Sequence, residues 1–156
     1  MKKLFAVLMT VAILSTVSLS AFAANTTGGE ADITTSIAPT YTVTIPADVN
    51  VQFNATETDF GTIEVVASQI HPDKCIKVSL ATDNKLENSI DATKVIPYAI
   101  KDAEGADFTS ATYLTEGDKT ELSIHITADD WNAAYAGDYS DTVTFSVSYV
   151  DKATNN

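Results

Sequence analysis

The chain contains no arginine: all nine of its cations are lysine, against 21 aspartate and glutamate residues. The formal net charge is −12. A chain this acidic cannot neutralise a run of phosphate groups, so the composition argues against nucleic acid as a partner. The missing guanidinium group also removes the planar fork that binds phosphate or carboxylate through two parallel hydrogen bonds.

The chain has a single cysteine, Cys75, so no disulfide can form within it. An odd cysteine in an exported protein indicates a free thiol or a bond between chains. We favour a structural free thiol and keep the bond between chains as the alternative. A catalytic role is disfavoured, because an activated thiol needs a positive environment or a paired base. By strand alternation, Cys75 is expected on the polar side of its strand, with Lys77 and Ser79.

Catalytic motifs are missing as well. The sequence contains no G-x-S-x-G, no H-E-x-x-H, no P-loop and no dinucleotide-binding fingerprint. Carboxylates are numerous, but an acid–base pair needs two carboxylates in opposed environments. We therefore predict that the protein is not an enzyme.

Long apolar runs are also missing. The segment Leu4 to Leu14 is shorter than the roughly 20 residues that a membrane-spanning helix needs. It follows Lys2 and Lys3 and precedes Ala21-Phe22-Ala23, an A-x-A cleavage pattern. Residues 1–23 thus predict a secretory signal peptide. Its removal takes two lysines away and changes the net charge from −12 to −14.

This targeting segment predicts a protein that is secreted and lies outside the cell or at its surface. In a host with two membranes the periplasm is the alternative. After the signal peptide we expect a polar, flexible leader over residues 24–32 and a single domain over residues 33–150. Residues 151–156 are expected to form a polar tail.

The dominant hydrophobic period in the domain is two, the period of a half-buried strand. In Thr40–Ile45 the residues Tyr41, Val43 and Ile45 share one face, and threonines occupy the other. Pro97 inside another apolar segment indicates an edge strand or a bulge. Further strands are expected at Ile33–Ile37, Val49–Phe53, Phe60–Ala67, Cys75–Ala81, Val95–Ile100, Glu121–Thr127 and Tyr139–Val150. A weaker strand is expected at Tyr113 and Leu114.

One segment departs from this period. Thr127 to Asp130 has the spacing of a helix N-terminal capping box, with aspartate in place of the usual Glu or Gln. Trp131 and Tyr135 follow at helical spacing, and Gly137 is a candidate end of the helix. We expect a helical turn or two here, before the last strand. Together, roughly seven to nine short strands predict an all-β fold, an antiparallel β-sandwich of immunoglobulin-like or pilin-like type.

The C-terminal stretch from Trp131 to Tyr149 resembles the closing segment of bacterial secreted β-sandwich domains of the spore-coat-U, pilin or adhesin-like kind. The matching residues are Ala136, Gly137 and Tyr139, which form a corner before a Thr/Val-rich strand. The resemblance implies an extracellular structural or adhesive role without catalysis. In sandwiches a tyrosine at such a corner can donate its hydroxyl to backbone a few residues upstream, and Tyr139 is the candidate.

Two ligand sites are candidates at the same end of the chain. Trp131 and Tyr135 would form a platform for stacking a sugar ring, or else pack against the end of the sandwich. Asp129, Asp130, Asp138 and Asp141 would supply oxygen ligands for calcium, although they do not match an EF-hand loop, or else form a solvated acidic loop. No other cofactor is expected.

The sequence as a whole favours a secreted, non-enzymatic structural or adhesive module of the cell surface. We expect it to bind a protein partner or a second copy of itself. A carbohydrate- or calcium-binding extracellular module is the alternative.

Overall fold

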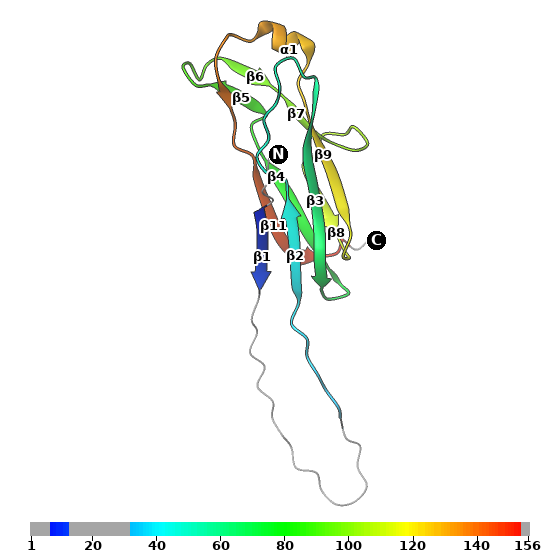
Figure 1. Ribbon diagram of the computed structural model, residues 1–156. Coiled ribbons are helices and arrows are strands. Elements are labelled where there is room, and N and C mark those ends of the chain that lie inside the picture. Colours follow the sequence, from blue (N-terminus) through cyan, green and yellow to red (C-terminus); the bar gives the residue numbers. More distant parts are fainter. Residues whose placement is uncertain (1–6, 13–31, 154–156) are drawn as a thin grey trace, which may run out of the picture.

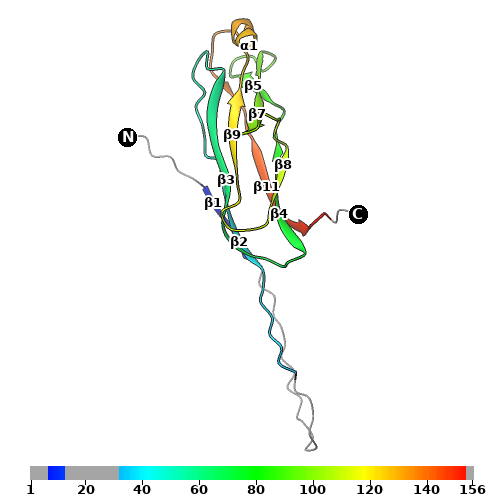
Figure 2. The same cartoon turned by 90° about the vertical axis from the view of Figure 1, so that its right-hand side faces the viewer.

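Two antiparallel β-sheets lie face to face and form the body of the protein (Figure 1, Figure 2). The computed structural model describes residues 7–12 and 32–153. One sheet has the strand order β1-β2-β3-β9-β7, and the other has the order β11-β4-β8. Their strands are β1 (Val7–Ala12), β2 (Thr40–Ile45), β3 (Glu57–Gln69), β4 (Lys74–Ala81), β7 (Ala99–Asp102), β8 (Ser110–Tyr113), β9 (Lys119–His125) and β11 (Thr144–Asp151).

A third, smaller sheet lies at one end of the sandwich (Figure 1). It has the order β10-β5-β6 and consists of β5 (Lys85–Asn88), β6 (Val95–Pro97) and β10 (Tyr139–Ser140). The helix α1 (Ala128–Ala133) covers the same end, between β9 and β10. We call this end the apex and define it as α1, the third sheet and residues 46–56. The prediction of an antiparallel β-sandwich with a short helix before the last strand is confirmed.

The core forms because alternate apolar side chains point between the two sheets. Ile63 and Val65 of β3 are fully buried, as are Ile76 and Val78 of β4 on the facing sheet. Ring contacts connect β11 with the facing sheet: the ring centroids of Tyr41 and Tyr149 lie 5.9 Å apart, and those of Phe60 and Phe145 are also 5.9 Å apart. The predicted inward faces of β2, β4 and β9 are therefore correct at Tyr41, Val43, Ile76, Val78, Leu122 and Ile124.

A bulge changes the predicted face of β3. Ala67 was expected to share the buried face of Ile63 and Val65, but it is exposed. The pairing of β2 with β3 shifts between Thr42 and Val43, which leaves Val66 as an additional residue on β3. One extra residue reverses the alternation of the strand beyond it.

Two segments predicted as single strands are each divided between sheets. Val95–Ile100 becomes β6 and β7, with Tyr98 between them, and Tyr139–Val150 becomes β10 and β11. In both cases the chain passes from the small apical sheet into one of the large sheets. Pro97 lies in β6, which is an edge strand as its missing N–H predicts.

Two other predicted strands do not form. Val49–Phe53 runs as loop and turn, and the side chain of Phe53 is 77% exposed. Ile33–Ile37 is extended and solvent-exposed, and no strand is assigned to it. Alternation alone could not distinguish these segments from true strands, because a strand also requires a neighbour for its backbone.

The strand order has immunoglobulin-like features. The succession β2-β3-β9-β7 follows the A-B-E-D order of an immunoglobulin sheet, and the pairing of β4 with β11 corresponds to that of strands C and F. In the described part of the chain, no strand pairs with the outer edge of β11, where such a fold places strand G. The outer edge of β11 is therefore an unpaired sheet edge among the described residues.

The ends of the chain depart from the predicted boundaries. The proposed signal peptide lies outside the described residues except for Val7–Ala12, which pairs with β2 as strand β1. The predicted leader lies outside them except for Asp32. Asp151 belongs to β11 rather than to a tail, and the Lys152 N–H donates to the Asp73 carbonyl at 2.9 Å. Within residues 7–12 and 32–153, no helix is long and apolar enough to cross a membrane.

Candidate functional site

The helix α1 begins at the predicted capping residue. The Thr127 hydroxyl accepts a hydrogen bond from the Asp130 N–H at 3.1 Å and donates one to the Asp130 carboxylate. These bonds satisfy helix-terminal groups that have no partner within the helix. The helix ends at Ala133, because Ala134 is already extended. Gly137 lies beyond this end, so its predicted role in closing the helix is wrong.

Trp131 joins α1 to the loop of residues 46–56. Its indole N–H donates to the carbonyl of Ala55 at 2.8 Å. Its ring meets the ring of Phe53 edge-on, with centroids 5.7 Å apart and an interplanar angle of 79°. It also packs against the hydrophobic core. Sugar stacking and packing at the end of the sandwich were the two predicted roles of Trp131. Its contacts are those of a packing residue.

Tyr135 has a different environment from Trp131. It lies past the extended residue Ala134, so the two rings do not share a helical face. Its side chain is 63% exposed, and the ammonium group of Lys94 lies 4.9 Å from the centre of the ring. This is the distance of a cation–π contact. Tyr135 alone thus presents a ring to solvent at the predicted carbohydrate platform.

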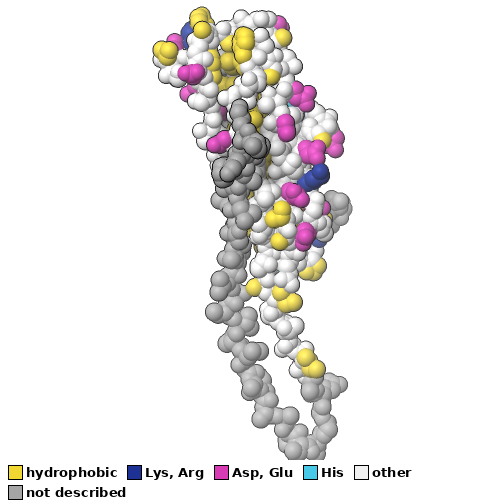
Figure 3. All heavy atoms as spheres, viewed as in Figure 1, with side chains coloured by type: hydrophobic (Ala, Val, Ile, Leu, Met, Phe, Trp, Pro, Cys, Tyr) yellow, Lys and Arg dark blue, Asp and Glu magenta, His cyan; other side chains and the backbone are white. Residues whose placement is uncertain are grey.

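Exposed hydrophobic side chains gather at the apex, over α1 and the neighbouring turns (Figure 3). Ile90, in the turn between β5 and β6, is 88% exposed, and Phe53 is 77% exposed. Together with Tyr135 and Val49 they form the apical apolar group. Sequence reasoning missed three of these members, since Phe53 and Val49 were assigned to a strand and Ile90 falls in a polar turn.

The predicted tyrosine corner is present. The Tyr139 hydroxyl donates to the carbonyl of Tyr135 at 2.9 Å and accepts from the Tyr135 N–H at 3.1 Å. The bond reaches backbone four residues upstream, as the corner pattern of sandwiches predicts. The two hydrogen bonds fix the turn between α1 and β10. They also fix the backbone of Tyr135, and so the position from which its exposed ring extends.

Asn88 is the structural residue that sequence reasoning overlooked. It is the buried polar residue of the described part, 6% exposed, and its side-chain oxygen accepts the N–H groups of Ile90 and Asp91 at 2.9 and 3.3 Å. Gly137 lies directly against its amide group. An asparagine two residues before a turn is an available signal, because asparagine commonly bonds to backbone two residues on.

The structure does not gather the four aspartates predicted as calcium ligands. Asp130 lies beside Asp129 in the first turn of α1 and accepts the hydroxyl of the capping residue Thr127, whereas Asp141 bonds to Tyr98 and Thr82. The backbone carbonyl of Asp138 accepts the Ser89 N–H at 2.8 Å. Among the described residues, no group of three or more His, Cys, Asp or Glu side chains is arranged to hold a metal ion.

Tyr98, Thr82 and Asp141 form a polar cluster beside β6. The Tyr98 hydroxyl donates to the carboxylate of Asp141, and the Thr82 hydroxyl donates to the same oxygen at 3.0 Å. Burial, followed by the hydrogen bond to Asp141, raises the pKa of Tyr98 above its ordinary value. The phenol therefore stays protonated and serves as a fixed hydrogen-bond donor. The bond connects the segment between β10 and β11, which contains Asp141, to the junction of β6 and β7, which contains Tyr98.

Cys75 has no disulfide partner within the described part of the chain, and its surroundings differ from those predicted. Its side chain is 3% exposed, although alternation placed it on the polar side with Lys77. The thiol donates to the Asp151 carbonyl at 3.8 Å and lines a hollow of about 640 Å³ that includes Leu114 and Val150. A thiol covered in this way is not placed to form a bond to another chain.

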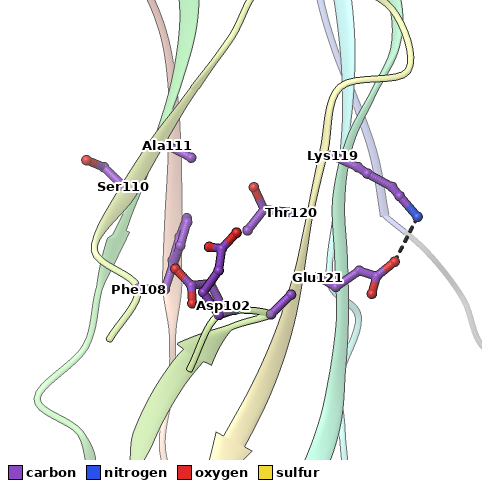
Figure 4. Close-up of a pocket in the computed structure, with 9 residues that line it drawn as sticks. Asp102, Phe108, Ser110, Ala111, Lys119, Thr120 and Glu121 are labelled. Atoms are coloured by element: carbon purple, nitrogen blue, oxygen red, sulfur yellow. Dashed lines mark hydrogen bonds and ion pairs between the residues drawn. The ribbon is translucent and has the colours of Figure 1, made fainter. Parts of the chain in front are cut away.

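A second hollow, of about 470 Å³, lies between β8 and β9 (Figure 4). Phe108 and Thr120 face it, whereas Lys119 and Glu121 pair with each other at 2.7 Å on the other side of β9. The Asp102 carboxylate accepts the N–H groups of Glu104 and Ala106 and thereby holds a turn. Of the charged side chains that line the hollow, Asp102, Lys119 and Glu121 are engaged in local structure.

The turn between β8 and β9 provides a pH-dependent contribution to stability. The Asp118 carboxylate accepts the N–H groups of Leu114 and Thr115 at 2.7 and 2.9 Å. These backbone hydrogen bonds lower the pKa of Asp118 below its ordinary value. The stabilisation is therefore complete above the ordinary aspartate pKa of about 3.9 and is lost as the pH falls through the lower, folded-state pKa.

We expect Asp118→Ala to lower the melting temperature at pH 6 by about 3–5 °C, since it removes bonds to a charged acceptor. The difference from the parent protein should shrink as the pH falls below about 4 and vanish in stronger acid. Melting curves followed by circular dichroism over this pH range measure it. Glu116→Ala removes the same charge from the same turn but none of these hydrogen bonds, so it should lower the melting temperature at pH 6 by less than Asp118→Ala does. A difference between Asp118→Ala and the parent protein that stays constant over the pH range would contradict the linkage.

Comparison of the chain with protein-family models, with curated proteins and with solved structures finds no match.

Proposed function

We propose that this protein is an exported, non-enzymatic module of the bacterial cell surface that has a structural or adhesive role and binds a protein partner through its apex. Support for export comes from residues 1–23, whose charged start, apolar run and A-x-A pattern are those of a signal peptide. Support for a binding role comes from the apical apolar group.

The single observation that carries the proposal is the exposure of large hydrophobic side chains at the apex. Phe53, Ile90 and Tyr135 are each more than half exposed there. Single exposed hydrophobic residues are ordinary, but several at one end of a molecule are characteristic of interaction surfaces. The hydrogen bonds of Trp131 and Tyr139 hold this surface in place, which lowers the entropy lost on binding.

A protein partner fits this surface better than a sugar does. Two of the exposed side chains are a phenylalanine and an isoleucine, which offer area but no hydrogen bonds. The indole N–H of Trp131 is not free to donate to a sugar hydroxyl, because it already donates to the carbonyl of Ala55. The exposed ring of Tyr135 next to Lys94 is the one observation that favours the carbohydrate alternative.

The test is adhesion of the purified, fluorescently labelled chain to cells of its source. We expect Phe53→Ser/Ile90→Ser to reduce the retained fluorescence at least tenfold, because it removes two apolar contacts while leaving the core intact. Leu114→Ser is the matched control: Leu114 is 45% exposed, in the turn after β8 and away from the apex, and its replacement should leave adhesion unchanged.

Equal retention by the apex variant, the control and the parent chain would refute the proposed binding surface. Loss of adhesion in Tyr135→Ala but not in Phe53→Ser/Ile90→Ser would instead identify the carbohydrate alternative. Export is measured separately, by sequencing the N-terminus of the protein recovered from the culture, where Ala24 is expected.

A further inference from the structure

The outer edge of β2 binds a strand. In the structure β1 pairs with it antiparallel over the whole strand, with Val7, Met9 and Val11 opposite Ile45, Val43 and Tyr41. The inference drawn here depends on the proposed export, because β1 lies within the signal peptide that export removes. In the processed chain the N–H and C=O groups on this edge of β2 have lost their partner. Such an open edge is a template for another strand.

A segment suited to that edge lies directly before β2. Ile33–Ile37 is extended and projects away from the sandwich (Figure 1). It alternates apolar and polar residues, apart from Thr35 on the apolar side. Ile33 is 99% exposed and Ile37 is 62% exposed, so neither side chain is covered by its own chain. The segment thus has the composition of a strand but no strand beside it.

This segment cannot pair with β2 of its own chain. Only Ala38 and Pro39 separate it from Thr40, and a two-residue hairpin needs a positive φ at the first loop position. An alanine disfavours positive φ, and a following proline restricts it further to extended conformations. The non-glycine residues with positive φ in the described part are Asn54 and Asn84, not Ala38.

We propose that two processed copies of this chain exchange these segments, so that Ile33–Ile37 of each copy pairs antiparallel with β2 of the other. Each chain then contributes one continuous strand over residues 33–45. The two strands are related by a two-fold axis at Pro39, which makes the contact self-complementary and closed.

The register of this exchange follows from the two-fold axis. Ile33 lies opposite Ile45, Thr35 opposite Val43 and Ile37 opposite Tyr41. These are the β2 positions that Val7, Met9 and Val11 oppose in β1. Because residues opposite each other in an antiparallel pair lie on the same face, Ile33 and Ile37 fall on the face of β2 that carries Tyr41 and Val43. The exchange therefore covers both exposed isoleucines.

Cysteine cross-linking of the processed chain, residues 24–156, tests the register. This chain keeps every core residue whose burial the structure describes, since these residues all lie between Tyr41 and Tyr149. In a Cys75→Ser background, one sample carries Ser36→Cys and a second, with a different tag, carries Thr42→Cys. In the proposed register these two positions are opposite each other, within reach of a disulfide.

After mixing and oxidation, we expect most of the protein to form a disulfide between the two tags, and neither variant to cross-link with itself. Light scattering of the unmodified processed chain should give the mass of a dimer. Thr112→Cys, exposed on β8 of the other sheet, replaces Thr42→Cys as the matched control and should cross-link at least tenfold less.

Thr35→Pro in the processed chain should shift the dimer to monomer while leaving the circular dichroism spectrum unchanged, because Thr35 is exposed and proline removes a ladder donor. A monomeric processed chain, or equal cross-linking at Thr112, would overturn the exchange and leave the apex proposal standing. Masses larger than a dimer would also overturn it, since one-way exchange extends without closing. If N-terminal sequencing shows that residues 1–23 are retained, export itself has failed, independently of either result.

Discussion

Replacing Gly137 by alanine should lower the free energy of unfolding by about 2–4 kcal/mol. Gly137 has a φ of +148°, a conformation that L side chains rarely adopt. A Cβ atom there would lie 2.5 Å from the side-chain nitrogen of Asn88. The amide cannot turn aside, because its oxygen accepts the Ile90 and Asp91 N–H groups. Urea denaturation followed by tryptophan fluorescence measures the loss.

Gly105→Ala is the matched control for this prediction. Gly105 also has a positive φ, of +81°, but nothing lies within 4 Å of the position of its Cβ. Its replacement should cost only the backbone part, about 1 kcal/mol. In an Asn88→Ala background the cost of Gly137→Ala should fall to a similar value, because the clashing group is gone. Equal losses for Gly137→Ala and Gly105→Ala in the parent chain would show that the contact with Asn88 has no energetic role.

Replacing Trp131 by alanine should lower the free energy of unfolding by about 2–3 kcal/mol. The change removes a half-buried ring, its edge-on contact with Phe53 and the hydrogen bond from the indole N–H to Ala55. The loop of residues 46–56 loses its connection to α1 as a result. Chemical denaturation followed by circular dichroism is the suitable measurement, since the fluorescent ring itself is removed.

Two variants separate the contributions in this prediction. Trp131→Phe keeps an aromatic ring but loses the N–H donor, and it should cost about 1 kcal/mol. Tyr135→Ala removes an exposed ring and should change stability by no more than about 0.5 kcal/mol. Unchanged stability in Trp131→Ala would mean that the ring does not stabilise the apex. It would favour the alternative prediction that Trp131 binds a ligand directly.

These expectations divide the apex into supporting and presenting residues. Asn88, Gly137, Tyr139 and Trp131 make hydrogen bonds or close contacts within the protein. Phe53, Ile90 and Tyr135 are mostly exposed, although the ring of Phe53 also contacts Trp131. Variants of the first group should therefore act mainly on stability. Variants of Ile90 and Tyr135 should act on adhesion, and a Phe53 variant should act on adhesion with a smaller loss of stability from its contact with Trp131.

Local chemistry explains which parts of the fold could be predicted. Thr40–Ile45 alternates so cleanly that its strand and its buried face both follow from the period of two. The start of α1 could be predicted because Thr127 and Asp130 bond to each other over three residues. The hydrogen bond of Tyr139 is equally local. In each case the partners lie within a few positions in the chain.

Other features depend on distant neighbours. Val49–Phe53 alternates as well as β2 does, but no strand pairs with it, and Phe53 meets Trp131 of a distant helix instead. Ala67 is exposed because of a bulge against β2, and Cys75 is buried by residues at the far end of the chain. The aspartates predicted as one site bond to separate parts of the molecule.

The sequence by itself determined the all-β class, the half-buried strands, the capped helix and the acidic, arginine-free surface, because each depends on composition or on neighbours along the chain. Only the tertiary structure decided where strands break between sheets, which hydrophobic residues stay exposed and which edge is open. Those outcomes depend on pairing and packing between segments far apart in the sequence, and a periodic pattern contains no information about its partner.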